Sequence, residues 1–235
     1  MRLVIKWIIG VLLLPLAAAA TLTFARQLQA DLDWRALDLT TWWFTGGFAV
    51  WLVLYFALPR PMWSYVLAHE CTHALWGLMM GAKVSRMKVG ERGGSVTLSK
   101  SNILITLAPY FFPFYTVITL LVFLIASVWI DFATYLPFWY ALFGLTWAFH
   151  ITFTLSILAI RQPDIMEHGR LFSYVIIYTI NLLTAAALMN LLTDRPLANL
   201  ATELGQDIPA AYQFVWNQTR PLLAAIKTQW PLTPQ

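Results

Sequence analysis

Charged residues are scarce in this sequence. Only 11% of its 235 residues are Asp, Glu, Lys or Arg, whereas 60% are hydrophobic. Soluble domains carry about 25% charged residues, so a soluble fold would have to expose many Trp, Phe and Leu side chains to water and would aggregate. Intrinsic disorder is excluded as well, because disordered chains are poor in apolar residues. The composition therefore indicates an integral membrane protein.

Cysteine and repeated segments are also lacking. Cys71 is the single cysteine, which excludes an internal disulfide and a zinc site built from several cysteines. The net charge of +4 comes without a basic run or an aromatic–basic motif, so we expect no nucleic-acid partner. No internal repeat is visible, and a transporter built from two repeated halves is therefore not indicated.

The apolar residues are gathered in about six segments, each near the ~20 residues that a membrane-crossing helix needs. The segments cover residues 3–25, 41–58, 62–81, 102–130, 135–160 and 171–192, and a polar loop is expected at 27–41. The first segment also resembles a signal peptide, because Arg2 and Lys6 precede an apolar run with an Ala-rich end, but its length favours a retained helix. Pro109 and Pro113 should interrupt the fourth segment.

A polar stretch between the third and fourth segments predicts a β-hairpin over residues 83–100. Residue character partly alternates in 83–89 and in 95–99, as in strands with one buried face, and a glycine-rich turn separates the two. A surface loop is the alternative. The predicted fold class is therefore an all-α polytopic membrane protein with about six transmembrane helices and one small β-hairpin.

The chain divides into three parts. Residues 1–61 hold two N-terminal helices and a polar loop, residues 62–193 form a core that includes the hairpin, and residues 194–235 form a tail. Leu197, Leu200 and Leu204 recur at helical spacing in the tail. This spacing predicts an amphipathic helix that lies on the membrane.

The third segment contains His69-Glu70-Cys71-Thr72-His73, a match to the pattern H-E-x-x-H. On a helix, residues i and i+4 lie on one face, so both imidazoles can bind a single Zn²⁺ at about 2.0–2.1 Å. Glu70 can then act as the base that takes a proton from water. The spacing predicts a hydrolytic zinc site that needs one further protein ligand.

The apolar setting strengthens this interpretation. Ionisable side chains inside a membrane helix cost about 2.5–3.5 kcal/mol each and are rare without a function. Three of them occur within this one motif, and the whole chain has only four histidines. The structural alternative is a cluster in which these side chains only hydrogen-bond to neighbouring helices. The free-energy cost of burying such a cluster without a function favours a metal site.

These residues give the sequence a resemblance to the site-2 protease family of intramembrane zinc metalloproteases. The resemblance rests on AHECTHALWGLMMGAKV, on GGSVTLS, which is similar to that family's membrane-associated β-hairpin, and more weakly on QPDIMEHGR. It covers about residues 62–181. It implies that two histidines and one aspartate bind one Zn²⁺ per chain, with His69 and His73 as the histidines and Glu70 as the residue that activates water.

The family's usual aspartate motif, Asn-Pro-Asp-Gly or Leu-Asp-Gly, is absent. The nearest counterpart is Gln162-Pro163-Asp164-Ile165, which follows the fifth segment in the order that the family has. Asp164 is therefore the predicted third ligand. Glu167, His168 and His150 are the alternatives, and the carboxylate of Asp164 could instead cap the following helix.

Further residues could support the site or bind substrate, with hydrogen bonding or packing inside the protein as the alternative role. These candidates are His150, Asn102, Asn181, Gly94, Ser95 and Val96. The exposed edge of the hairpin could capture an extended substrate by strand addition.

The resemblance implies a transmembrane protein as substrate, cleaved within the lipid bilayer by a multi-pass protein of the bacterial inner (plasma) membrane. Five Lys or Arg against one acidic residue favour a cytoplasmic hairpin. Six spans would then put the N-terminus outside, whereas Arg2 and Lys6 argue for the inside. A catalytically inactive zinc-binding scaffold is the main alternative function, and a metal-ion transporter is a second.

Overall fold

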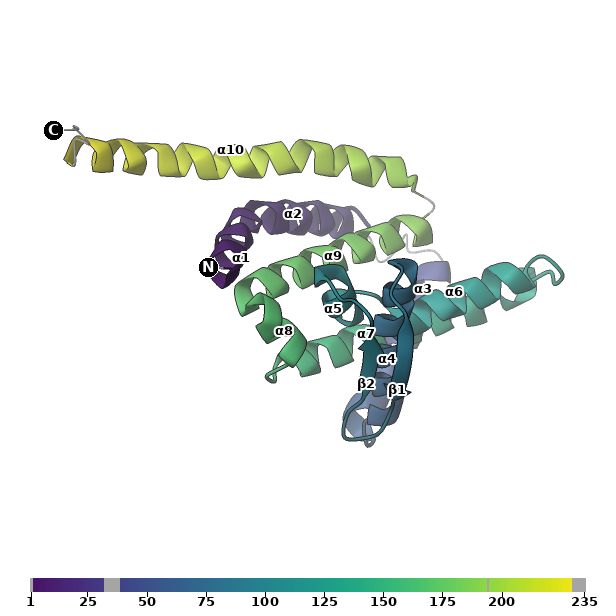
Figure 1. Ribbon diagram of the computed structural model, residues 1–235. Coiled ribbons are helices and arrows are strands. Elements are labelled where there is room, and N and C mark those ends of the chain that lie inside the picture. Colours follow the sequence, from purple (N-terminus) through teal and green to yellow (C-terminus); the bar gives the residue numbers. More distant parts are fainter. Residues whose placement is uncertain (1, 32–38, 194, 230–235) are drawn as a thin grey trace.

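The computed structural model describes residues 2–31, 39–193 and 195–229, and it is mostly helical with one antiparallel pair of strands (Figure 1). The helices are α1 (Arg2–Leu12), α2 (Leu14–Asp31), α3 (Leu39–Ala57), α4 (Met62–Met79), α5 (Ile103–Leu107), η1 (Ala108–Tyr110), α6 (Phe114–Ala126), η2 (Ala133–Tyr135), α7 (Leu136–Leu158), α8 (Pro163–His168), α9 (Arg170–Leu192) and α10 (Leu197–Gln229). The strands are β1 (Val84–Lys88) and β2 (Ser95–Leu98). A mainly helical chain with a small hairpin is thus confirmed.

Several helices are long and apolar enough to cross a membrane. Within the described residues they are Leu3–Ala30, Leu39–Ala57, Ala133–Leu158 and Arg170–Leu191. The pair Ile103–Tyr110 and Phe114–Ala126 adds a fifth if its two halves, bent by 83°, form one span. The bend confirms the interruption expected at Pro109 and Pro113, since proline removes a backbone donor and disfavours helix before it. Helix α4 is not in this set, so these stretches are fewer than the six expected.

The N-terminal helices pack against the rest of the chain. Helix α1 lies beside α9, and the ammonium group of Lys6 donates to Nδ1 of His168 at 2.5 Å. Helix α2 continues to Asp31, so the loop expected from residue 27 begins later; residues 32–38 of that loop lie outside the described chain. Gln27 lies within α2, and its side-chain amide donates to Glu203 of α10 at 2.8 Å.

The tail is helical, as expected, and runs antiparallel to α2 (Figure 1). Polar side chains join the two helices. The hydroxyl of Thr23 donates to Asp207 at 2.6 Å, Arg26 forms an ion pair with Asp207, and the hydroxyl of Tyr212 donates to the carbonyl oxygen of Leu12 at 2.8 Å. At these positions α10 therefore turns polar side chains toward α2.

An aromatic cluster fixes the position of α4. Helices α3 and α7 cross closely at Gly47, where a Cβ atom would lie 1.8 Å from the carbonyl oxygen of Ala141. This approach brings Trp51 of α3 against Phe153 of α7, and the ring of Phe153 stacks on that of Tyr65 in α4, with 4.9 Å between centroids. Because all three rings are buried, they anchor the N-terminal half of α4.

The hairpin lies along α4. Its strands pair with Met87 opposite Val96 and Lys88 opposite Ser95. Val96 and Leu98 are half-buried whereas Ser95 is exposed, so β2 turns an apolar side toward the helix. The hairpin expected over residues 83–100 is confirmed, and α4 provides the surface that an isolated two-stranded sheet would need for stability.

Candidate metal site

Helix α4 places its two histidines on one side. His69 and His73 are one turn apart, and their ring centroids are 4.8 Å apart. The side chains of both are only 12% exposed. The motif therefore forms a pair of neighbouring imidazoles beneath the protein surface.

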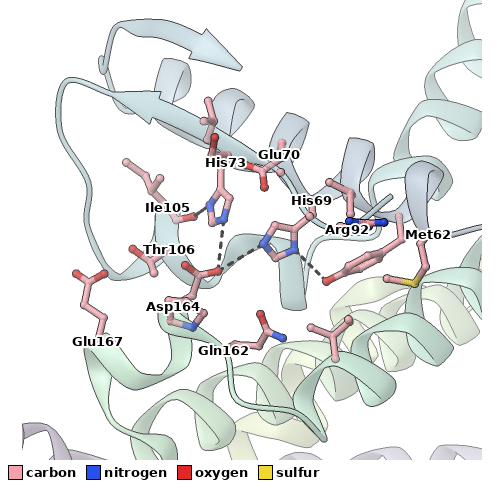
Figure 2. A pocket seen from close by; sticks show the side chains of 18 of the residues that line it. Met62, His69, Glu70, His73, Arg92, Ile105, Thr106, Gln162, Asp164 and Glu167 are labelled. Atoms are coloured by element: carbon pink, nitrogen blue, oxygen red, sulfur yellow. Dashed lines mark hydrogen bonds and ion pairs between the residues drawn. The ribbon is translucent and has the colours of Figure 1, made fainter. Parts of the chain in front are cut away.

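Asp164 reaches this pair from a separate part of the chain. It lies in the first turn of α8, a short helix that begins with Pro163, where the missing N–H costs nothing. Its Oδ2 atom lies 3.4 Å from Nε2 of His69 and 3.6 Å from Nε2 of His73 (Figure 2). The structure thus brings together the three residues that the sequence predicted as zinc ligands.

The spacing of these atoms fits a tetrahedral ion. Ligand bonds of about 2.0–2.1 Å at tetrahedral angles separate neighbouring ligand atoms by roughly 3.3 Å. The two distances to Asp164 are close to this value, and one ligand atom from each of the three residues lies within 4.8 Å of the others. In the described part of the chain, no other group of three His, Cys, Asp or Glu side chains meets this condition. Two imidazole nitrogens and one carboxylate oxygen also match a zinc donor set with one position left open.

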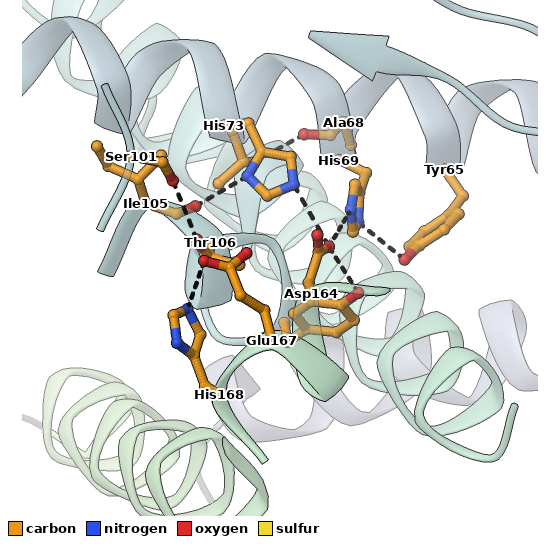
Figure 3. Close-up of polar contacts among 12 residues, drawn as sticks. Tyr65, Ala68, His69, His73, Ser101, Ile105, Thr106, Asp164, Glu167 and His168 are labelled. Carbon is orange, nitrogen blue, oxygen red and sulfur yellow. Dashed lines mark hydrogen bonds and ion pairs between the residues drawn. The ribbon is translucent and has the colours of Figure 1, made fainter. Parts of the chain in front are cut away.

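Each histidine is oriented through its second ring nitrogen. Nδ1 of His69 lies 3.0 Å from the hydroxyl of Tyr65, and Nδ1 of His73 lies 2.8 Å from the carbonyl oxygen of Ile105 (Figure 3). Ile105 is held in turn by Asn102, whose side-chain oxygen caps α5 by accepting from the Ile105 N–H at 2.9 Å. Since Nδ1 is engaged in both rings, Nε2 is the nitrogen that remains for an ion.

A further chain of hydrogen bonds supports Asp164. The fully buried Tyr110 donates its hydroxyl to Oδ2 of Asp164 at 3.0 Å. The backbone oxygen of Tyr110 accepts from the amide of Asn181 at 2.9 Å, and Nε2 of His150 donates to the oxygen of Asn181 at 3.1 Å. His150 and Asn181 therefore connect to the site through Tyr110.

The carboxylate of Asp164 is kept in its charged form. Burial raises its pKa, but the neighbouring imidazoles of His69 and His73 outweigh burial and hold the pKa of Asp164 below its usual range. An ionised carboxylate is the form that binds a cation.

A cavity of about 610 Å³ opens beside the three residues. The hairpin forms one wall with Gly94, Ser95 and Val96, and α8 forms another with Asp164 and Glu167. Glu70 lines the same cavity, close to both histidines (Figure 2). The candidate base and the candidate ligands thus face one space large enough for an extended peptide segment.

The alternative third ligands have other surroundings. The Glu167 side chain lines the cavity but is 62% exposed. His168 is buried and contacts Lys6, while His150 contacts Asn181. Asp164 alone of the four candidates lies within ligand distance of both motif histidines.

Two tyrosines at the site were not predicted. Tyr65 is four residues before His69, so helical spacing could have placed it next to that ring. Tyr110 gives no comparable signal, because it lies in the aromatic run 110–115 and reaches Asp164 only through the bend after α5.

Comparison with known proteins returns no relative: no family model matches this chain, and no curated protein or solved structure is significantly similar to it.

Proposed function

We propose that this protein is a zinc metalloendopeptidase that cleaves transmembrane proteins within the membrane. The observation that carries the proposal is the convergence of His69 and His73 with Asp164, a residue from a distant segment, beside a cavity that Glu70 also lines. The several long apolar helices are compatible with a membrane protein. The open cavity favours a catalytic site over a purely structural metal site, which would be closed.

The proposed chemistry assigns one task to each side chain. A zinc ion held by His69, His73 and Asp164 would polarise the scissile carbonyl and lower the pKa of water. Glu70 accepts the proton of the attacking water and passes it to the leaving amine. Tyr65 and the carbonyl oxygen of Ile105 hold the imidazoles in the orientation that presents Nε2.

The proposed substrate enters as an extended segment. A transmembrane helix satisfies its own backbone hydrogen bonds and must unwind locally before a peptide carbonyl can be attacked. Within the described sheet, β2 pairs only with β1, and its residues Ser95 and Val96 line the cavity. Strand addition to β2 would replace the backbone hydrogen bonds that the substrate gives up.

The test combines metal analysis with a cleavage assay on purified wild type and Glu70→Gln. We expect about one zinc per chain in both proteins and cleavage of single-span substrates by the wild type alone. Zinc in both proteins without cleavage in either would instead favour an inactive zinc-binding scaffold. Equal cleavage by both, or the absence of zinc, would contradict the proposal.

A further inference from the structure

We propose that Gly94 is a positioning residue that holds the side chain of Glu70 in place, an inference that rests on the proposed function. Glu70 is 7% exposed, although it lines the cavity. Among the described residues, no hydrogen bond or ion pair holds its carboxylate. The orientation of the proposed base therefore depends on the atoms packed around it.

The backbone of Gly94 supplies part of this packing. A Cβ atom on Gly94 would lie 2.7 Å from Cγ of Glu70, 2.7 Å from Cγ1 of Val66 and 2.8 Å from the carbonyl oxygen of Lys88. All three distances are too short for a real side chain, so glycine is the only residue that fits without displacing a neighbour. The hairpin backbone and α4 are therefore in direct contact at this point.

Val66 completes the confinement of Glu70. It precedes Glu70 by one helical turn and lies on the same face of α4. Both side chains pack against Gly94, so the methylene groups of Glu70 are enclosed between their own helix and the hairpin. Because Gly94 has no side chain, Glu70 and Val66 pack directly against its backbone, and the hairpin forms a wall of the site at this point.

Replacement of Gly94 by alanine tests this role. The added methyl group must push Glu70 or the hairpin aside, and a misplacement of about 1 Å at a reacting group costs on the order of 100-fold in rate. We expect Gly94→Ala to lower kcat by about 10- to 100-fold, with a smaller change in KM, because the neighbouring hairpin residues also bind substrate, and with wild-type zinc content. The assay uses purified protein and single-span model peptides that carry a quenched fluorophore pair.

Gly90→Ala is the matched control. Gly90 lies in the same turn, and the nearest atom to its Cβ position, the carbonyl oxygen of Gly93, is at an ordinary 3.5 Å. We expect kcat of this variant to stay within about twofold of wild type. Adding Val66→Ala to Gly94→Ala removes one of the three collisions and should restore part of the lost kcat, because changes at touching residues are not additive.

The outcomes separate this inference from the proposed function. An unchanged kcat in Gly94→Ala overturns the inference alone. Loss of zinc or protease sensitivity of the hairpin also overturns it, because either result assigns Gly94 to the stability of the fold. The absence of any rescue by Val66→Ala overturns it too, because the packing around Gly94 would then not limit kcat. Absence of cleavage by the wild type contradicts the proposed function itself.

Discussion

At the scale of single residues, three contacts meet at one oxygen atom. Oδ2 of Asp164 faces the two motif imidazoles and accepts a hydrogen bond from Tyr110. The carboxylate of Asp164 binds a cation well only when it is ionised and held in one orientation. Asp164 supplies the charge, and the hydrogen bond from Tyr110 supports the orientation of its carboxylate. Two different substitutions can therefore remove the charge and the orientation separately.

Asp164→Asn removes the charge while preserving the shape of the side chain. We expect the zinc content of the purified protein to fall well below one ion per chain, because two neutral imidazoles alone form a weak site. Glu167→Gln is the matched control, since Glu167 also lines the cavity from α8 but lies outside the ligand cluster. An unchanged zinc content in Asp164→Asn would show that another residue is the third ligand.

Tyr110→Phe removes the hydroxyl that supports Asp164. Loss of a partner that orients a metal ligand typically weakens metal binding by 10- to 100-fold, and we expect a decrease in zinc affinity in this range. Competition with a chelator of known affinity measures it. Tyr115→Phe is the control, because its hydroxyl contacts Ser64 and not the ligands. Equal zinc affinities in the two variants would show that Tyr110 does not support the metal site.

Sequence reasoning identified the parts of the site that have a fixed spacing or order. His69 and His73 follow from their helical spacing, Glu70 follows from the pattern H-E-x-x-H, and Asp164 was predicted from the motif order of the site-2 protease family that the sequence resembles. Tyr65 and Tyr110 were missed because a chain with 15% aromatic residues offers many equivalent rings. Asn102 was a candidate to support the site or bind substrate; it caps α5 and thereby holds Ile105, which contacts His73, a role that depends on where that short helix begins.

At the scale of elements, α8 depends on its neighbours for its position. It has only six residues, so its own hydrogen bonds cannot stabilise it. Lys6 of α1 contacts both His168 and the backbone oxygen of Glu167 at the end of α8. Burial and the charge of Lys6 lower the pKa of His168, which keeps that imidazole neutral and able to accept from the ammonium group. An N-terminal helix thereby holds the segment that carries Asp164.

Lys6→Met should loosen this attachment. We expect zinc affinity to fall several-fold, because α8 would sample positions in which Asp164 is too far from the histidines. The measurement is the same chelator competition, with Lys83→Met, an exposed change in the hairpin segment, as control. A zinc affinity equal to that of the wild type would show that α8 is held by its other contacts.

Glycine and proline made the hairpin and the broken fourth segment predictable, because these residues restrict the backbone itself. The end of α2 was predicted too early. Polar residues such as Gln27 suggested a loop, yet they continue the helix since α10 supplies their partners. Such long-range pairing has no local signature in the sequence.

At the scale of the whole molecule, the hairpin determines which side of a membrane the site would face. Its five basic residues against one acid favour the cytoplasmic side. We expect Lys83→Cys, made together with Cys71→Ser, to react with a membrane-impermeant maleimide only after the inner face of the membrane is exposed. Labelling in intact cells would show that the hairpin lies on the outer side of the membrane.

The distance along the sequence between His73 and Asp164 has a consequence for stability. An ion held by both joins segments about 90 residues apart that the unfolded chain does not hold together, so zinc stabilises the folded protein by about 4 kcal/mol at a free concentration about 1,000 times its Kd. Loading zinc into the metal-free protein should therefore raise Tm by roughly 10 °C, given about 2–4 °C per kcal/mol at this chain length. Glu70→Gln should show the same rise and Asp164→Asn should not, so the ion would act as a staple between segments that no disulfide can join.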